Sequence, residues 1–598
     1  MAPFGIPNFY DRVGHPPQNY TQQPKKTGGG FPVPGKQDPS ASWVMTNHYF
    51  VSHEKWPTIV KDEEFDYIVV GSGCTALAFI SETLRIDPKK RILCLERGDF
   101  WLPSHFQNLP LPFKVVLGGV SETFPWTLSE KTFKDPLLGY CHGSCPFFGG
   151  RSAFWSAWSP QPRIEDMRGF PESMIKATQE AIFWPEAKRL LNVTSASDVD
   201  DTIFAGLQDV IDERLREPGD RIPTTTVSEP AQLSVGRRSP TSTLRFNKFS
   251  VPGPLLRIKE EQAAKEKEGT GARLDIALGC VVEKLRADGG MVRSIETSLG
   301  PISWANDNTK VVLCAGAFPA ATLLLNSFDS CAKTVGKRVT GHFQTHITAR
   351  VPLSTFGPWS PAIGKSDQPC KLEIAAHYLA GEDADTKQQY HVQVTAIHSP
   401  NPTEDAEDAA RECPDYAAAA TEEQLRDSTE HVVFVCATLG EFSEHNPHSW
   451  FRRDEQNQDV TTNVKLQYTL TDADRKLWDL MDEATYQTIE AMSGPAPKGK
   501  DLGLEYWHDG PTGGSGFWSR ERPENVRVPG IVHEASTAFV GGEEAGGSVD
   551  ALGRPHGVQN VFVTGGALFP TAGSWNPTLT MCGFAQHLAR ELNAYTVT

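Results

Sequence analysis

Residues 66–98 read DYIVVGSGCTALAFISETLRIDPKKRILCLERG, and this stretch decides the fold. The apolar, β-branched run at 67–70 is typical of a buried parallel strand. It is followed by the pattern G-x-G-x-x-A at Gly71, Gly73 and Ala76, then by helix-forming residues and a second apolar run. The order predicts a strand–turn–helix–strand unit of the dinucleotide-binding type.

The chemistry of this turn suits a pyrophosphate. The first glycine permits the sharp turn, the second lets phosphate approach the backbone, and Ala76 allows close packing of helix on strand. A helix that begins near Cys74 and Thr75 directs its N–H groups at the phosphate. Glu96, followed by Arg97, stands where an acid accepts hydrogen bonds from a ribose. An ordinary tight turn is the alternative, and the turn alone does not distinguish FAD from NAD.

Composition narrows the class of protein. The 598 residues are enough for two or more domains. The net charge of −17 argues against nucleic acid and anionic membranes as partners. The 11 cysteines lack metal-ligand spacing, so no metal site is expected and most should be small buried hydrophobes. With no visible signal peptide or membrane-spanning run, we expect an intracellular, cytoplasmic protein.

The pattern of elements changes along the chain. Strand–glycine–helix units recur before residue 345, and four β-rich segments between 346 and 439 predict an antiparallel sheet. The predicted fold class is therefore α/β, or α+β overall, with a Rossmann-like cofactor domain that is discontinuous in sequence and a second, substrate-binding domain built on the antiparallel sheet. The expected division is an N-terminal arm at 1–61, a cofactor domain at 62–170, 240–345 and 545–598, and a substrate domain at 171–239 and 346–544.

Two segments have compositions that leave their structure open. The arm resists independent folding, but Trp43, Tyr49, Phe50 and Trp56 indicate that part of it packs on the body or on a neighbouring subunit. The acidic, alanine-rich stretch 403–430 is expected to be a solvated loop or surface helix, with a partner-binding segment as the alternative.

A second glycine-rich segment, residues 139–158, reads GYCHGSCPFFGGRSAFWSAW. Gly149 and Gly150, followed by Arg151 and Ser152, let backbone pass close to a flat ligand that the aromatic residues could flank. A glycine-rich surface loop is the alternative.

Four segments, taken in order, resemble the glucose–methanol–choline (GMC) family of FAD oxidoreductases. They are the opening turn with its end at 95–98, the loop at 149–152, the strand–glycine–helix region at 310–342, and residues 560–580, which read NVFVTGGALFPTAGSWNPTLT. The last segment is similar to the pyranose oxidase and cholesterol oxidase branch, in which Asn rather than a second His precedes Pro. The order and spacing of these segments favour FAD over NAD.

The resemblance implies a FAD site built from both ends of the chain. Its expected cofactor-binding residues are Gly71, Gly73, Cys74, Thr75, Ala76, Glu96, Arg97, Gly149, Gly150, Ser152, Val282, Ala315, Gly316, Gly565, Gly566, Asn576, Pro577 and Thr578. Relatives often carry a His in the glycine loop that links covalently to the flavin. Phe154 stands at the matching position, so we expect FAD to be bound non-covalently.

The resemblance also implies two catalytic residues, His533 and Asn576. An imidazole has a pKa suited to taking the hydroxyl proton, and an amide at a helix N-terminus can hold the substrate oxygen while charge develops. A structural histidine and a helix cap are the alternatives. We expect His342 to be structural or pocket-lining. The residues after His533, Glu-Ala-Ser-Thr-Ala, depart from the family's glycine-rich pattern, so sugar specificity does not carry over.

The expected function is oxidation of an alcohol group of a sugar, polyol or hydroxylated secondary metabolite, by hydride transfer to flavin N5. O2 or a quinone would accept the electrons, so oxidase and dehydrogenase both remain open, and a homo-oligomer is an open option. The alternative is a GMC-like flavoenzyme without net oxidation, such as a lyase, isomerase or cyclase. A disulfide reductase using Cys141 and Cys145 would need a second, NAD-type fingerprint, which the sequence lacks. A non-catalytic binding protein is a further alternative.

Overall fold

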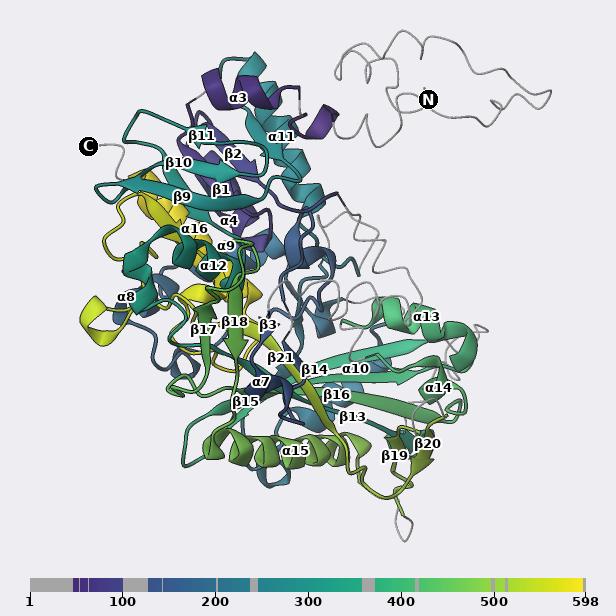
Figure 1. Cartoon of the computed structure of the whole chain (residues 1–598). Coiled ribbons are helices and arrows are strands. Elements are labelled where there is room, and N and C mark those ends of the chain that lie inside the picture. The colour runs from purple at the N-terminus through teal and green to yellow at the C-terminus, as the bar shows by residue number, and fades with distance from the viewer. Residues whose placement is uncertain are drawn as a thin grey trace, which may run out of the picture.

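The computed structural model describes residues 47–594 apart from 53, 63, 101–126, 142, 200–202, 237–245, 358–371, 415–418, 496–500 and 511–514 (Figure 1). Most of the predicted arm, residues 1–46, lies outside this range. Its end does pack on the body, because Phe50 and Trp56 are buried and Trp56 Nε1 donates a 2.8 Å hydrogen bond to the Leu299 carbonyl. Trp56 begins helix α3 (Trp56–Asp62).

A parallel sheet forms around the opening stretch. Within the described residues it has five strands in the order β22-β12-β1-β2-β8. These are β22 (Val561–Val563), β12 (Lys310–Leu313), β1 (Tyr67–Val70), β2 (Ile92–Leu95) and β8 (Leu274–Ala277). Every residue of β1, β2 and β8 is buried, as expected of a parallel sheet covered on both faces.

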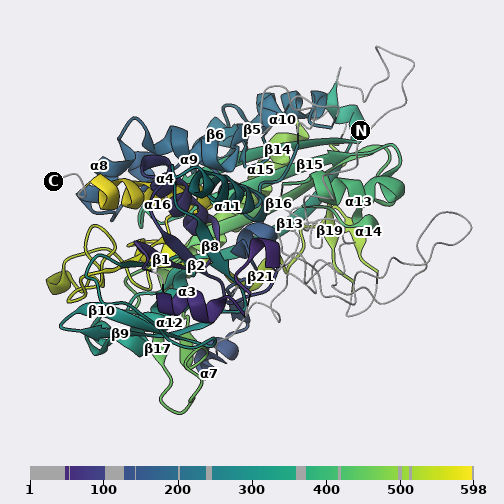
Figure 2. The ribbon, with the colours of Figure 1, turned by 90° about the horizontal axis from the view of Figure 1, so that it is seen from above.

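Helices and a small sheet cover the parallel sheet, which lies between them in Figure 2. On one side, α4 (Cys74–Ile86) packs against α16 (Thr578–Ala594), which in turn contacts α9 (Phe183–Leu191). α11 (Pro252–Lys267) packs against β8 and α4. On the other side, α12 (Ala317–Ser327) packs on β9. β9 belongs to a sheet of β9 (Val282–Asp288), β10 (Met291–Thr297) and β11 (Ile302–Ser303).

A second large sheet confirms the predicted antiparallel half. Its long strands pair in the order β13-β16-β15-β14, with every pairing antiparallel. They are β13 (Thr340–Pro352), β14 (Glu373–Glu382), β15 (Gln389–His398) and β16 (His431–Glu441). β6 (Thr225–Pro230) extends this sheet on one side, and β19 (Glu505–His508) and β20 (Phe517–Ser519) extend it on the other.

The acidic stretch carries helices at the edge of this half. α13 (Pro402–Glu412) buries Ala406, Ala409 and Ala410, while its acidic residues begin in the first turn. α14 (Glu422–Leu425) follows, and residues 415–418 of the stretch lie outside the described range. The long helix α15 (Asp472–Ser493) packs on β13, β15 and β16 and begins with a capping box between Thr471 and Asp474.

Several shorter helices and strands complete the two halves. They are β3 (Thr127–Leu128), α7 (Glu130–Phe133), β4 (Tyr140–Cys141), α8 (Glu172–Thr178), β5 (Thr194–Ser195), α10 (Gly206–Leu215), β7 (Gln232–Leu233), β17 (Trp450–Arg453) and β18 (Val464–Gln467). Of these, α8 packs against α16, and α10 packs against β14. No helix of the described part of the chain has the length and apolar character needed to cross a membrane.

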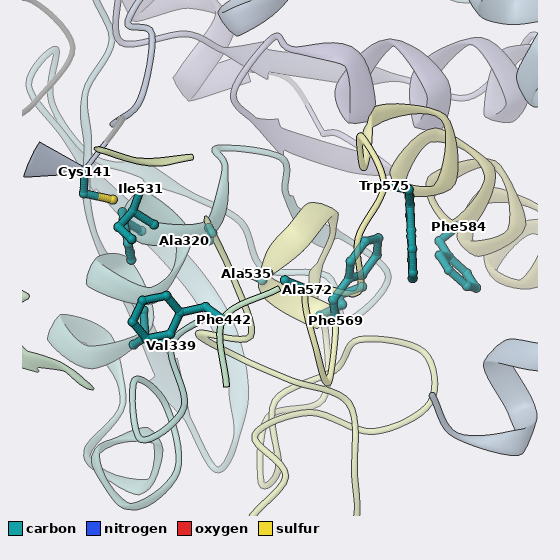
Figure 3. Packing of buried hydrophobic residues seen from close by; sticks show 14 of the residues in the cluster. Cys141, Ala320, Val339, Phe442, Ile531, Ala535, Phe569, Ala572, Trp575 and Phe584 are labelled. Atoms are coloured by element: carbon teal, nitrogen blue, oxygen red, sulfur yellow. The ribbon is translucent and has the colours of Figure 1, made fainter. Parts of the chain in front are cut away.

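The seam between the halves is made by β21 (Arg527–Ala535) and the C-terminal segment after β22. β21 pairs with both β13 and β4. The Ser536 N–H donates to the Gly566 carbonyl, and the Ala538 N–H to the Ala567 carbonyl. Figure 3 shows Ala535, at the end of β21, beside Ala572 of the C-terminal segment. The strand that carries His533 and the segment that carries Asn576 are therefore fixed to each other.

Candidate active site

A cavity of about 460 Å³ lies between the parallel sheet and the antiparallel sheet. Its walls bring together most of the residues predicted for the site. They are Gly71, Gly73, Cys74, Thr75, Glu96, Arg97, Gly150, Ser152, Val282, Ala315, Gly316, His533, Gly565, Gly566, Asn576, Pro577 and Thr578. Two predicted residues, Ala76 and Gly149, do not line it. Ala76 is buried within α4, and a Cβ on Gly149 would stand 2.6 Å from Pro252 Cδ, so both positions serve close packing behind the wall.

One end of the cavity is formed by backbone. We call Gly71, Gly73 and Gly150 the glycine cradle. Gly71 has a φ of +95°, and a Cβ there would lie 2.6 Å from the Cys314 carbonyl oxygen. A Cβ on Gly73 would meet no protein atom within 4 Å, which leaves space for a ligand to approach. α4 begins at the next residue with no side-chain cap, so its first N–H groups are available to an anion.

Glu96 both faces the cavity and organises the turn. Its Oε2 accepts hydrogen bonds from the Ser72 N–H at 3.0 Å and the Ser72 hydroxyl at 2.6 Å, and its Oε1 accepts from the Gly98 N–H at 2.8 Å. Burial raises the pKa of this carboxyl, and these bonds oppose the rise. Ser72 Oγ also accepts from the Gly149 N–H. Ser72 thus links the two glycine segments, a role that the variable position of the G-x-G pattern did not indicate.

Two residues that line the cavity, Ser144 and Trp158, have a polar atom without a hydrogen-bond partner in the described structure. These atoms, Ser144 Oγ and Trp158 Nε1, are buried, which indicates that the cavity suits a ligand with polar groups. Buried polar groups are normally paired. Together with the glycine cradle, they fit a long ligand that carries phosphates at one end. Phe154 also lines the cavity and offers no nucleophilic atom.

The opposite end, which we call the reacting end, carries His533 and Asn576. His533 lies in β21 with a φ of +58°, a conformation that is uncommon for residues other than glycine and often marks functional sites. The register between β13 and β21 shifts on both sides of His342. Such irregularities can re-aim a side chain, and His533 lines the cavity.

His342, from β13, lies behind His533 rather than on the cavity wall. The two Nδ1 atoms are 2.8 Å apart, and the rings meet edge to face with centroids separated by 5.0 Å. His342 Nε2 lies 2.9 Å from the Gly573 carbonyl oxygen. Burial lowers the pKa of His342 to about 4, so this ring is neutral at neutral pH.

Asn576 is buried immediately before α16, and β15 holds its amide. Asn576 Oδ1 accepts a 2.9 Å hydrogen bond from Gln393 Nε2. His391 lies two residues before Gln393, and its Nδ1 is 2.9 Å from Ser574 Oγ. Burial and then the neighbouring His342 hold the pKa of His391 well below its ordinary value. Neither β15 residue was predicted from the sequence. The sequence feature that could have indicated His391 and Gln393 is the alternation of polar side chains in an otherwise apolar strand.

The residue after the predicted base also reaches the cavity. Glu534 Oε1 is 3.1 Å from Arg151 Nη2, and both residues line the wall. Burial raises the pKa of Glu534, and the Arg151 charge opposes that rise. The departure from the glycine-rich pattern therefore introduces a partly buried ion pair beside His533. Within the described residues, no group of three or more His, Cys, Asp or Glu side chains could hold a metal ion.

A glycine turn on a parallel sheet, beside a second, antiparallel sheet, is an arrangement typical of dinucleotide-binding proteins. Comparisons with known proteins narrow this class. Residues 449–585 match the family model described as GMC oxidoreductase. The crystal structure of pyridoxine 4-oxidase from Mesorbium loti shares the fold, with a TM-score of 0.55 and 15% identity over 89% of this chain and 99% of that chain. No curated protein matches the chain.

The family match covers residues 449–585 only, and the structural match shows a shared fold, so both agree with the GMC resemblance seen in the sequence. FAD is the cofactor typical of the GMC oxidoreductase family.

Proposed function

We propose that this chain binds FAD in the cavity without a covalent link and oxidises an alcohol to a carbonyl compound. The glycine cradle and the start of α4 would hold the pyrophosphate, and Glu96 would hold a ribose. Ser144 and Trp158 supply further donors on the wall. When bound, FAD accepts the hydride that leaves the alcohol carbon.

The residues of the reacting end would manage the hydroxyl group. His533 takes its proton, since imidazole is a suitable base near neutral pH. Asn576 donates an amide hydrogen to the same oxygen and holds it while negative charge develops. Gln393 orients this amide, because it occupies Asn576 Oδ1 and so directs the Nδ2 donors elsewhere.

One observation carries the proposal. An imidazole and an amide donor line the same cavity as the glycine cradle, and an alcohol hydroxyl is both a donor and an acceptor. We further propose that the antiparallel half forms the substrate domain, with the ranges expected from the sequence, because Gln344 and Gln393 of its strands line this end. The electron acceptor would be O2 or a quinone.

Two measurements on the purified protein test the proposal. Denaturation should release FAD into the supernatant, whereas flavin that stays with the precipitated chain would contradict non-covalent binding. Anaerobic addition of sugars, polyols and aromatic alcohols should then bleach the flavin and yield one carbonyl product per flavin. A chain that contains no FAD, or whose flavin no alcohol bleaches, would contradict the function.

A further inference from the structure

The feature that the proposed function leaves unexplained is the buried histidine behind the base. His342 is completely buried and does not line the cavity. Even so, one of its two ring nitrogens, Nδ1, lies within hydrogen-bonding distance of His533. A histidine that served only to fill the core would not need its second nitrogen aimed at another imidazole. The role of this nitrogen follows from where the protons lie on the two rings.

The proton positions follow from the Gly573 carbonyl, which can only accept. Because His342 Nε2 lies 2.9 Å from that oxygen, the proton of the ring is on Nε2. A neutral imidazole carries one N–H, so His342 Nδ1 holds a lone pair and can only accept. Its partner at 2.8 Å is His533 Nδ1, which must then donate. The neutral His533 ring consequently carries its lone pair on Nε2.

The carbonyl that starts this chain is itself fixed. The Gly573 N–H donates to Thr571 Oγ1 at 2.9 Å, and Thr571 Oγ1 donates to Glu441 Oε1. Glu441 lies directly opposite His342 in the pairing of β13 with β16. The turn 571–573 and the two strands therefore hold the Gly573 carbonyl in line with His342.

Because His342 is neutral, the hydrogen bond between the two rings has one direction, with His533 as donor and His342 as acceptor. A protonated His342 would carry hydrogens on both nitrogens and would oppose the N–H of His533. Burial disfavours that charged state and lowers the pKa of His342. His391 is the other ring beside His342, with centroids 5.6 Å apart, and burial favours its neutral form too.

We infer that His342 is a positioning residue that fixes His533 in the tautomer protonated on Nδ1, which makes Nε2 the nitrogen that takes the substrate proton. This inference rests on the proposed role of His533 as the base. The proton then passes from the substrate hydroxyl to His533 Nε2, which makes an imidazolium whose Nδ1–H remains bound to His342. No atom of His342 contacts the substrate, and no proton leaves the pair.

Two substitutions separate this role from a structural one. The amide oxygen of His342→Asn falls near the position of Nδ1 and can still accept from His533. The amide nitrogen of His342→Gln falls near Nε2 and keeps only the contact with Gly573. We expect His342→Gln to lower the rate constant of flavin reduction about 10- to 100-fold, by analogy with the loss of a partner that orients a metal-binding histidine. His342→Asn should recover most of that loss.

The matched control is His398→Gln. His398 is also buried in the antiparallel sheet, and its Nδ1 lies 2.9 Å from the His431 carbonyl oxygen, but it does not line the cavity. It should leave the rate constant unchanged. Anaerobic stopped-flow mixing of each FAD-loaded variant with an alcohol, across a range of pH, supplies the rates. The acidic limb of the plot of this rate constant against pH should shift in His342→Gln and should stay in place in His342→Asn.

A spectroscopic readout does not depend on turnover. In holoenzyme with ¹⁵N-labelled histidine, the resonances missing from His533→Ala identify His533, and its protonated nitrogen should be Nδ1. A proton on Nε2, or equal rates for the Asn and Gln variants, would overturn the inference while leaving the proposed function intact. Normal flavin reduction by His533→Ala would instead overturn the proposed function.

Discussion

The two ends of the cavity are built in different ways. The glycine cradle uses backbone from short sequence patterns, and its working feature at Gly73 is open space where a Cβ would stand. The reacting end uses two side chains that strands from the antiparallel sheet hold in place, His533 through β13 and Asn576 through β15. The contrast teaches that the proposed cofactor site is built from local turns, whereas the proposed chemistry depends on long-range strand register.

The largest effect should come from removing the base. We expect His533→Ala to lower the rate constant of flavin reduction about 10²- to 10⁴-fold with the FAD content of the protein unchanged, since the cradle does not depend on this side chain. Anaerobic stopped-flow absorbance measures both quantities. His448→Ala, at an exposed histidine, is the control. Loss of FAD together with the rate would show that the two ends are not separable.

Removing the amide donor of Asn576 should lower the rate constant of flavin reduction by less than removing His533. Asn576→Ala should lower the same rate constant about 10²- to 10³-fold, the usual loss for one donor to a developing negative charge. Gln393→Leu should have a smaller effect in the same direction, because the amide of Asn576 survives without its orienting partner. If Gln393→Leu proved the more damaging of the two in this assay, Asn576 would not be the donor to the substrate oxygen.

Acid should destabilise the reacting end through His342. Its folded-state pKa of about 4 lies below the ordinary 6.5, so the unfolded chain binds the proton more readily and stability falls as pH drops from 6.5 towards 4. The shift corresponds to at most about 3 kcal/mol. Urea unfolding of wild type and His342→Asn should diverge over this interval, with the wild type losing more. Parallel pH dependences would show that His342 is not buried in its neutral form.

A methyl group in the cradle should weaken cofactor binding without harming the fold. Gly73→Ala places its Cβ where no protein atom lies within 4 Å, so the thermal unfolding of the apoprotein should not change. The methyl group occupies ligand space, and overpacking of about 1–3 kcal/mol weakens FAD binding about 5- to 150-fold. Gly542→Ala is the control, since that site is also open and lies outside the cavity. Equal FAD affinity for both variants would place the pyrophosphate elsewhere.

The difference between the glycine cradle and the reacting end also explains how much of each could be predicted from the sequence. The turn at Gly71 and Gly73 is local, so the strand, helix and acid around it could be read within residues 66–98, and the alternation of later segments predicted the antiparallel sheet. Ser72 was not found, because its bonds to Glu96 and Gly149 cross between segments.

The supports of the reacting end could not be predicted in this way. His342 and Gln393 sit in strands whose pattern indicates only a β-structure, and their roles arise from register: β13 lies against β21, and β15 faces the segment before α16. A shift of one residue would turn either side chain to the opposite face of the sheet. The backbone conformation at His533 likewise depends on the irregular pairing of β21 with β13.

The most direct test of alcohol oxidation at the reacting end is a comparison of isotopes in the flavin-reduction step. An alcohol that bleaches the flavin is prepared with deuterium on the carbon that bears the hydroxyl, and its reduction rate constant is measured anaerobically beside that of the unlabelled alcohol. We predict slower reduction by the deuterated alcohol, because that C–H bond breaks as His533 removes the hydroxyl proton. Equal rate constants, with a carbonyl product absent, would contradict alcohol oxidation at this site.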